Sequence, residues 1–554
     1  MGLVWEKRSS RQIGGFGAVR PAGRRRRGPY VAAAILAVVV LVLAAAALLL
    51  ISAQGSLSAD STAIAKVGLP LGGGAIESVS AVTGPRARPL PVVVRNGKIW
   101  PRHSIRAGRQ LSIEVVIKRP GWIAWLAGKT ERLRLSLVTP TASLSDDYVT
   151  LAPGASLPVR FDRPVAALSY GPTTGALRRK VLASPASEVT LARSAIAGTV
   201  WVSGIPRTWE TAPAAAISWF PDGAATAAVA SPAPGTQIGP TTPIALTFSK
   251  PVSAALGNSR PPVSPATPGT WHQVNDHTIV FGPTGYGYGL AANVTVGLPS
   301  GVKLIGGRRS GSSEDGTWTV PPGSTTGLQQ LLANLGYLPL RFNYANGAGP
   351  AKTPQAEEAA AIKPPRGSFT WRWGSIPSNL RNMWAPGTSG VMTQGAVMAF
   401  ESNEGMTTDG VASAPVWKAL IGAAITGKGS SSFGYTFAMV SEGSPESIDV
   451  WHDGRTVVTG PVNTGIASRP TAQGTFPVFE HALSVTMSGT NPDGSHYSDP
   501  GVPYVSYFNG GDALHGFIRA SYGWPQSLGC VEMPYSQAAA VYPYTPIGTL
   551  VNVI

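Results

Sequence analysis

The chain has 554 residues, of which 44 are lysine or arginine, 28 are aspartate or glutamate and one is cysteine. The lone cysteine excludes an intrachain disulfide and any metal centre built from several cysteines. The length indicates several domains, and 66 glycines with 49 prolines disfavour a helix-rich enzyme, whereas a hydrophobic fraction of 43% disfavours disorder. We therefore expect a multidomain, mainly β protein.

The N-terminal segment combines a basic tail with an apolar run. Its first 27 residues hold Lys7 and seven arginines against Glu6, and residues 31–51 are 21 uncharged, apolar positions. This pattern predicts a cytoplasmic tail at 1–28 and a transmembrane helix at 29–53, with the rest of the chain outside a bacterial cell membrane. A cleaved signal peptide is disfavoured because its apolar core would be too long. A nucleic-acid partner is not expected, since the arginines adjoin the apolar run.

Strand patterns follow the apolar run. Residues 54–88 are rich in glycine, alanine and serine and predict a linker. Residues 111–117 and 132–138 alternate polar with aliphatic side chains, as strands with one solvated face do. We expect β structure over 89–228.

An internal repeat indicates two related β domains. APGASLPVRFDRPVAAL at 152–168 is similar to APGTQIGPTTPIALTFSKPVSAAL at 233–256, which predicts equivalent buried strand positions for Phe161 and Phe248. Further strands are predicted within 269–283 and 292–298. The pattern resembles bacterial immunoglobulin-like β-sandwiches, the first within 89–228 and the second at 229–322.

Helical periodicity appears at 326–339 and 394–420, with stops at Gly336 and Gly405. These segments resemble the small helical peptidoglycan-binding domain, which would occupy 323–425 with an insertion at 341–390. The insertion carries three tryptophans: Trp371, Trp373 and Trp384. They are expected either to fill the core of the loop or to stack on sugar rings.

The terminal segment 431–554 is acidic, with a net charge of −6, whereas residues 28–430 carry +15. A basic stalk would suit contact with anionic wall polymers, although a solvated surface explains the charge as well. Short strand patterns around the Asp453-Gly454 turn predict an all-β module.

The only cysteine, Cys530, lies in SLGCVEM, fifteen positions after His515 in ALHGFIRA. A lone cysteine is most often a small buried residue. Here Ser527 and Gly529 predict a tight turn at which backbone N–H groups can stabilise an oxyanion, and unpaired thiols are seldom kept outside the membrane.

Three motifs together resemble the L,D-transpeptidase catalytic domain: TGPVNTGIASRPTAQGTFPVF at 459–479, His-Gly at 515–516, and SLGCVEM. The resemblance implies that Cys530 is the nucleophile, that His515 is the general base and acid, and that the Gly516 carbonyl orients the imidazole. Ser527 and Gly529 match the turn before the nucleophile. Two positions depart from the family pattern: Leu528 stands in place of a second histidine, and Glu532 in place of an arginine or asparagine.

The resemblance implies acyl transfer on peptidoglycan stem peptides, without a metal or another cofactor. His515 is expected to hold Cys530 as a thiolate by lowering its pKa. Tyr504, Tyr507 and Trp524 are candidates for a substrate cleft, and core packing explains them as well. Two alternatives stay open: a non-catalytic wall-binding scaffold, and an L,D-carboxypeptidase in which water cleaves the thioester.

Overall fold

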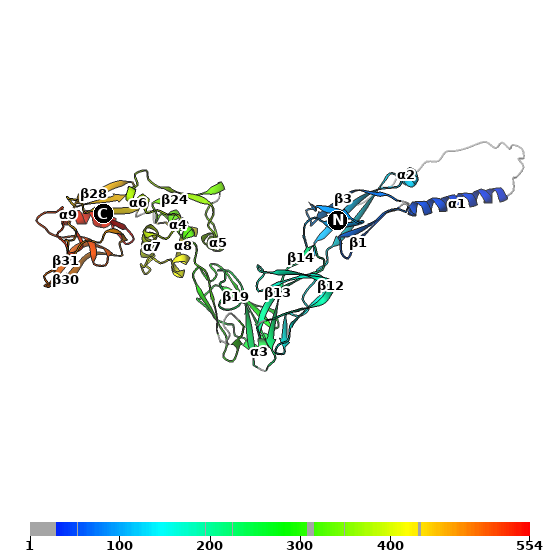
Figure 1. The fold of residues 1–554 in the computed structure, drawn as a ribbon, viewed down its shortest axis with the longest axis horizontal. Helices are drawn as coiled ribbons and strands as arrows, with labels where there is room; N and C mark the ends of the chain where they lie inside the picture. The colour runs from blue at the N-terminus through cyan, green and yellow to red at the C-terminus, as the bar shows by residue number, and fades with distance from the viewer. Residues whose placement is uncertain are drawn as a thin grey trace, which may run out of the picture.

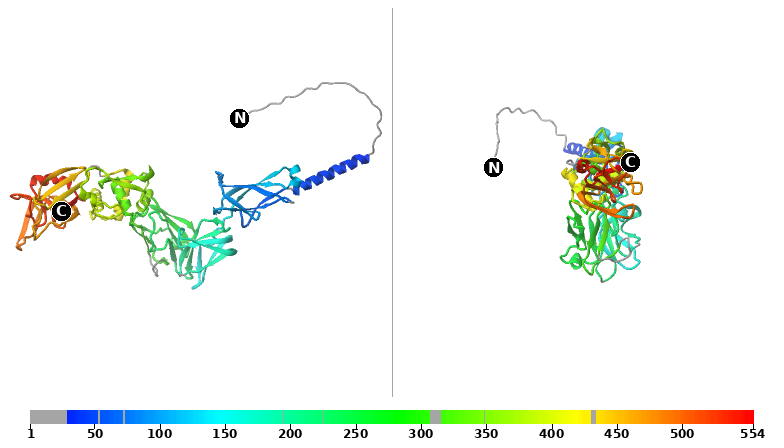
Figure 2. Two further views of the ribbon diagram at one scale, coloured as in Figure 1. Left: turned by 45° about the horizontal axis from the view of Figure 1, so that its top comes forward. Right: turned by 90° about the vertical axis from the view of Figure 1, so that its left-hand side faces the viewer.

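The structure, a computed structural model, describes residues 29–52, 54–71, 73–193, 195–223, 225–306, 315–347, 349–429 and 434–554. The predicted tail at 1–28 lies outside the described residues. The modules follow one another in chain order, from helix α1 at one end to the C-terminal module at the other (Figure 1). The turned views show the same order (Figure 2).

The chain begins its described part with α1, Pro29–Ser52, a helix of 24 residues. Side chains along it are described at 33–48 and 51, and most of them are exposed. Among the described residues, no helix reaches the length and apolarity that crossing a membrane requires. The predicted span at 29–53 therefore stays a prediction.

The first β module stacks two four-stranded sheets, in the orders β1-β2-β6-β5 and β4-β3-β8-β9. Its apolar core lies between them and includes Ile64, Ile99, Leu111 and Ile117. The elements are β1 Ser56–Ala59, β2 Ala65–Gly68, β3 Ala75–Thr83, β4 Arg88–Pro89, β5 Val92–Arg95, β6 Lys98–Pro101, β7 Ile105–Arg106, β8 Gln110–Lys118, α2 Gly121–Ala127 and β9 Thr130–Val138.

The prediction of a linker at 54–88 is wrong. Strands β1 to β3 and part of β4 lie there, and β3 pairs with β8 along its whole length. The physical reason is the spacing of apolar residues: Ile76, Val79 and Ala81 contribute to the core between the glycines and serines that suggested a flexible chain. The strands predicted at 111–117 and 132–138 are confirmed as β8 and β9.

The second module is a single five-stranded sheet, in the order β10-β15-β13-β11-β12. Strand β11 bends at a register shift between Arg160 and Val165. Outside this sheet, β14 pairs with β7 of the first module. The elements are β10 Tyr148–Leu151, β11 Leu157–Gly171, β12 Arg178–Leu191, β13 Gly198–Ile205, β14 Glu210–Thr211 and β15 Ala215–Pro221.

The third module has two sheets, β19-β20-β17-β16-β22 and β18-β21-β23. Phe248 on β17 and Phe161 on β11 are both buried on strands, as predicted, and the immunoglobulin-like kinship of the two modules stays a prediction. The elements are β16 Ala227–Ser231, β17 Ile244–Phe248, α3 Val252–Leu256, β18 Val263–Ser264, β19 Gly269–Asn275, β20 Thr278–Pro283, β21 Asn293–Gly297, β22 Lys303–Leu304 and β23 Asp315–Thr319.

The helical module contains the helices predicted at both ends of 323–425, and Gly336 and Gly405 have positive φ just past α4 and α7. The insertion forms a hairpin, β24 with β25, together with α5 and α6. The elements are α4 Thr325–Asn334, β24 Leu340–Tyr344, the 3-10 turn Ala345–Gly347, α5 Pro354–Ile362, β25 Gly367–Trp371, α6 Ser378–Asn382, α7 Val391–Asn403 and α8 Ala414–Thr426.

The C-terminal module packs a five-stranded sheet, β28-β27-β26-β34-β29, against a four-stranded one, β30-β31-β32-β33. It departs from the all-β prediction in the helix α9, which packs on β32. The elements are β26 Thr436–Ser441, β27 Ser447–His452, β28 Arg455–Pro461, β29 Gly474–Pro477, β30 Glu480–Thr490, β31 His496–Asn509, β32 Asp512–Gly516, β33 Val531–Met533, α9 Tyr535–Val541, the 3-10 turn Tyr542–Tyr544 and β34 Leu550–Val553.

One apolar core runs from the third module through the helical module into the C-terminal one. It joins residues such as Phe248, Trp417 and Phe437 in a continuous cluster. Trp373 of the insertion packs edge-on against Trp451, with ring centroids 5.5 Å apart, so core packing is the observed role of this tryptophan. The C-terminal module is therefore joined to the helical module by packed apolar surface.

Candidate active site

His515 lies on β32, and Cys530 directly precedes the neighbouring strand β33. β32 runs parallel to β33, with Leu514 opposite Val531 and His515 opposite Glu532. Leu514 and Val531 belong to the core between the two sheets. Because side chains alternate along a strand, His515 and Glu532 point to the other face. Cys530 directly precedes β33 and packs in a small apolar cluster with Ala513 of β32, so the predicted nucleophile and base lie on neighbouring segments.

The imidazole of His515 is oriented by its own neighbour. Nδ1 lies 3.0 Å from the carbonyl oxygen of Gly516, as the family resemblance implied. Since a carbonyl oxygen only accepts, Nδ1 carries the proton and Nε2 is left as the basic nitrogen. The side chain is buried, and this burial lowers the pKa of His515 below its ordinary 6.5. The histidine is therefore neutral at neutral pH.

The Cys530 thiol donates to the carbonyl oxygen of Gly511 at 3.5 Å. Burial, with the charges of Asp512 and Glu532 added, raises the pKa of Cys530 to about 12. This direction is opposite to the expectation that His515 holds Cys530 as a thiolate, which stays a prediction. His515 is buried and Cys530 is half-buried, and loss of solvent favours the neutral form of each.

The turn before Cys530 is fixed by a serine and a glycine. Ser527 Oγ donates to the carbonyl oxygen of Cys530 at 2.6 Å and accepts from the Gly529 amide at 3.2 Å. Gly529 has φ +121°, a conformation that other residues adopt with strain. A Cβ at Gly529 would also approach Asp512 Oδ1 to 2.5 Å. Both residues thus occupy the positions predicted for them.

A buried carboxylate beneath this turn was not predicted. Glu446 accepts from the Thr464 amide at 2.6 Å and from the Thr464 hydroxyl at 2.7 Å. The carbonyl oxygen of Thr464 in turn accepts from the Ser527 amide at 2.9 Å. Glu446 therefore anchors the segment that holds the turn before Cys530, a role with no sequence signal because the groups lie far apart in the chain.

Glu532, which departs from the family pattern, is paired with an arginine from a nearby loop. Arg519 donates from Nε at 2.7 Å and from Nη2 at 2.8 Å to the two carboxylate oxygens. The Glu532 backbone exchanges two hydrogen bonds of 2.9 Å with Asn463. Glu532 is thus paired with a cation that comes from a position thirteen residues earlier.

The three aromatic residues predicted to line a substrate cleft lie in different surroundings. Burial and the charge of Cys530 raise the pKa of Tyr507, which packs with Cys530 in a small apolar cluster. Tyr504 instead packs against the inner core, with its ring 5.7 Å from that of Tyr542. Trp524 is 47% exposed on the loop after β32. Tyr497, whose pKa Cys530 also raises, was missed because it lies on a distant hairpin strand.

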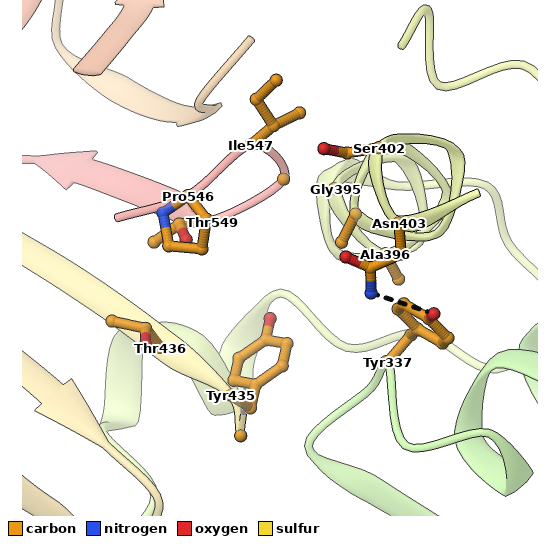
Figure 3. Close-up of a pocket in the computed structure, with 13 residues that line it drawn as sticks. Tyr337, Gly395, Ala396, Ser402, Asn403, Tyr435, Thr436, Pro546, Ile547 and Thr549 are labelled. Atoms are coloured by element: carbon orange, nitrogen blue, oxygen red, sulfur yellow. Dashed lines mark hydrogen bonds between the residues drawn. The ribbon is translucent and has the colours of Figure 1, made fainter. Parts of the chain in front are cut away.

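A pocket of about 90 Å³ lies away from these residues, between α7 and the turn before β34 (Figure 3). Asn403 donates to the Tyr337 hydroxyl at 3.0 Å on its helical side. Gly395 and Gly548 bring the two backbones into close approach. The pocket belongs to the interface between modules. Among the described residues, no cluster of three His, Cys, Asp or Glu side chains offers a metal site.

Comparisons with known proteins address the C-terminal module. Three similar solved structures are L,D-transpeptidases: the NMR structure of the E. faecium catalytic domain (25% identity, 22% of this chain and 99% of that chain, TM-score 0.20), one from Mycobacterium smegmatis (12%, 59% and 96%, 0.20) and one from Mycobacterium tuberculosis (14%, 59% and 96%, 0.19). No curated protein matches the chain. The family model of the YkuD L,D-transpeptidase catalytic domain matches residues 437–553. The C-terminal region of this chain therefore carries an L,D-transpeptidase catalytic domain of the YkuD family.

Proposed function

We propose that this protein cross-links peptidoglycan by acyl transfer through Cys530. The observation that carries the proposal is the hydrogen bond from His515 Nδ1 to the Gly516 carbonyl, which leaves Nε2 as the basic nitrogen on β32, next to the strand that Cys530 precedes. A thiol and an oriented imidazole on neighbouring segments are the parts that cysteine acyl transfer needs.

The first step forms a thioester. As the Cys530 sulfur attacks the carbonyl of the third residue of a tetrapeptide stem, its proton passes to His515 Nε2. The tetrahedral oxyanion is stabilised by the Cys530 amide at the end of the Ser527–Gly529 turn. The C–N bond to the terminal D-alanine then breaks, and His515 returns the proton to the leaving amine.

The second step transfers the acyl group. An amine of a neighbouring stem attacks the thioester, and His515 accepts one of its protons. The C–S bond breaks, and that proton regenerates the thiol. Each proton moves only between Cys530, His515 and the leaving or attacking amine. The proposed reaction therefore needs no cofactor.

Before substrate binds, Cys530 and His515 are both expected to be uncharged, which determines when the proton moves during catalysis. Because burial raises the pKa of Cys530 to about 12 and lowers that of His515, proton transfer accompanies the attack instead of preceding it. A protonated thiol also protects the nucleophile from oxidation before substrate arrives, since the thiolate is the reactive form.

The test is cross-link formation by the full-length protein with a tetrapeptide donor and an amine acceptor, followed by mass spectrometry. Cross-linked product from the unmodified protein, and none from Cys530→Ala, supports the proposal. Free tripeptide without cross-links would identify the carboxypeptidase alternative. A donor left intact by the unmodified protein would favour the scaffold.

We also propose that residues 31–51 attach the chain to a bacterial membrane, with the catalytic domain outside. The support is the run of 21 apolar residues after a segment of net charge +7. Trp122 and Trp125, 42% and 80% exposed on α2 beside the end of α1, suit a membrane–water interface. Protease treatment of intact protoplasts tests this, because degradation of the C-terminal domain is expected and its protection would contradict the orientation.

A further inference from the structure

The guanidinium of Arg519 is held rigidly beside the site. Glu532 binds its Nε and Nη2, and the carbonyl oxygen of Gln526 accepts from Nη2 at 3.4 Å. Its central carbon also lies 4.8 Å from the centroid of the Phe517 ring, which meets the His515 ring edge-on. Nη1 makes no hydrogen bond within the described part of the chain, and the Arg519 side chain is 31% exposed. One nitrogen of an oriented cation is thus left for a ligand.

This cation lies on the His515 side of the site. Glu532, which holds it, is directly opposite His515 in the register of β32 and β33. Phe517 also contacts both the guanidinium of Arg519 and the ring of His515. The leaving residue of a donor must take a proton from His515, so its carboxylate would enter the site next to this cation.

The charge of the module makes this cation exceptional. Residues 431–554 contain nine carboxylate side chains and only three cationic ones: Arg455, Arg469 and Arg519. Arg455 starts the edge strand β28, and Arg469 lies exposed on the loop before β29. In so acidic a module, these arginines are the groups that attract an anionic substrate. Among them, Arg519 has its guanidinium held in a defined orientation by the Glu532 carboxylate.

We propose that Arg519, oriented by Glu532, binds the terminal carboxylate of the donor stem peptide, the carboxylate of the D-amino acid that leaves. This inference rests on the proposed acyl transfer and assigns a donor subsite within it. Arg519 contacts substrate, whereas Glu532 is a positioning residue. An arginine–carboxylate contact favours the free acid over its neutral amide and makes recognition depend on charge.

The experiment measures acylation of the full-length protein by two tetrapeptide donors, one with a free terminal carboxylate and one with a terminal carboxamide. We expect the unmodified protein to prefer the acid by about tenfold to a hundredfold. The preference should collapse toward unity in Arg519→Ala, persist in part in Arg519→Lys, and weaken in Glu532→Gln. Arg455→Ala is the matched control, because it removes an exposed arginine of the same module and should keep the preference.

Other outcomes overturn the inference. Equal loss of rate for both donors in Arg519→Ala, with a shifted melting temperature, would assign the arginine a structural role. Loss of the preference in Arg469→Ala but not in Arg519→Ala would place the subsite on the other loop, and an unmodified protein without preference would remove the subsite. Failure of the unmodified protein to be acylated by either donor would instead refute the proposed function.

Discussion

Nδ1 of His515 and the carbonyl oxygen of Gly516 lie 3.0 Å apart, so the backbone of the residue that follows the base fixes its tautomer. A carboxylate in that place would favour the imidazolium, whereas a carbonyl favours it less. Burial then lowers the pKa of His515. At neutral pH His515 is consequently uncharged, and its Nε2 can accept a proton without an ion pair forming first.

The acylation rate should accordingly be nearly flat from pH 7 to 9. Below that range it should fall as His515 gains a proton, with a midpoint under the ordinary histidine value of 6.5. His515→Ala should lower the rate at pH 7 by roughly 10²-fold or more, and its rate should climb through the alkaline range toward the thiol pKa of about 12. Stopped-flow acylation measures both profiles. His496→Ala, an exposed histidine of the β30–β31 hairpin, should behave as the unmodified protein, and a bell centred near pH 8 would contradict the neutral pair.

Gly529→Ala should abolish most activity while the module stays folded. The substitution combines a strained φ of +121° with a Cβ contact to Asp512, and strain of this kind costs about 1–3 kcal/mol. The turn should relax by moving the Cys530 amide, with at least a tenfold loss of acylation. Gly501→Ala is the control, because φ there is +74° with no atom near the added Cβ. Equal activities of the two variants would show that the turn tolerates displacement.

Gly548→Ala should loosen the contact between the catalytic and helical modules. Its φ is +89°, and a Cβ would collide with the Gly395 carbonyl oxygen and lie 2.6 Å from the Ala399 amide. Hydrogen exchange of α7 should therefore become faster. Gly405→Ala, with φ +66° and open space around it, should leave α7 protected. Unchanged exchange in Gly548→Ala would mean that the interface adapts without opening.

Glu358→Gln should stabilise the protein at alkaline pH. The carboxylate is buried, its Oε2 lacks a hydrogen-bond partner, and burial raises its pKa from 4.5 to about 8. The folded state thus binds the proton more tightly, so stability falls as pH rises from 4.5 to 8. At pH 8 the glutamine variant should be more stable by about 4 kcal/mol, and at pH 5 by less than about 1 kcal/mol. Calorimetry of both variants tests this, with exposed Glu77→Gln as the control; a pH-independent gain would contradict it.

Sequence patterns predicted what depends on local spacing. The alternation of polar and apolar residues at 111–117 was enough to predict strand β8. A glycine after a helical repeat of apolar residues was enough to predict where α4 and α7 end. The roles expected of Cys530 and His515 came from the resemblance of short motifs and stay a prediction. These features are encoded within a few residues, so no knowledge of the partner strand is needed.

Features that depend on distant partners could not be predicted in the same way. Residues 54–88 look flexible until β8 is available to pair with β3. Glu532 was recognised only as a departure from the family pattern, because the Arg519 that pairs with it lies on a loop whose path the sequence does not reveal. The pKa values of Cys530 and His515 depend on burial, which motif resemblance leaves open.

The central claim is that Cys530 attacks a stem peptide as the acyl-accepting nucleophile. Intact-mass spectrometry of the full-length protein, quenched in acid after mixing with a tetrapeptide donor, tests it most directly. We predict an adduct equal to the donor minus its terminal D-alanine, mapped to Cys530 and absent from Cys530→Ala. Release of D-alanine without an adduct on this cysteine at any time point, or an adduct that persists in Cys530→Ala, would contradict the account.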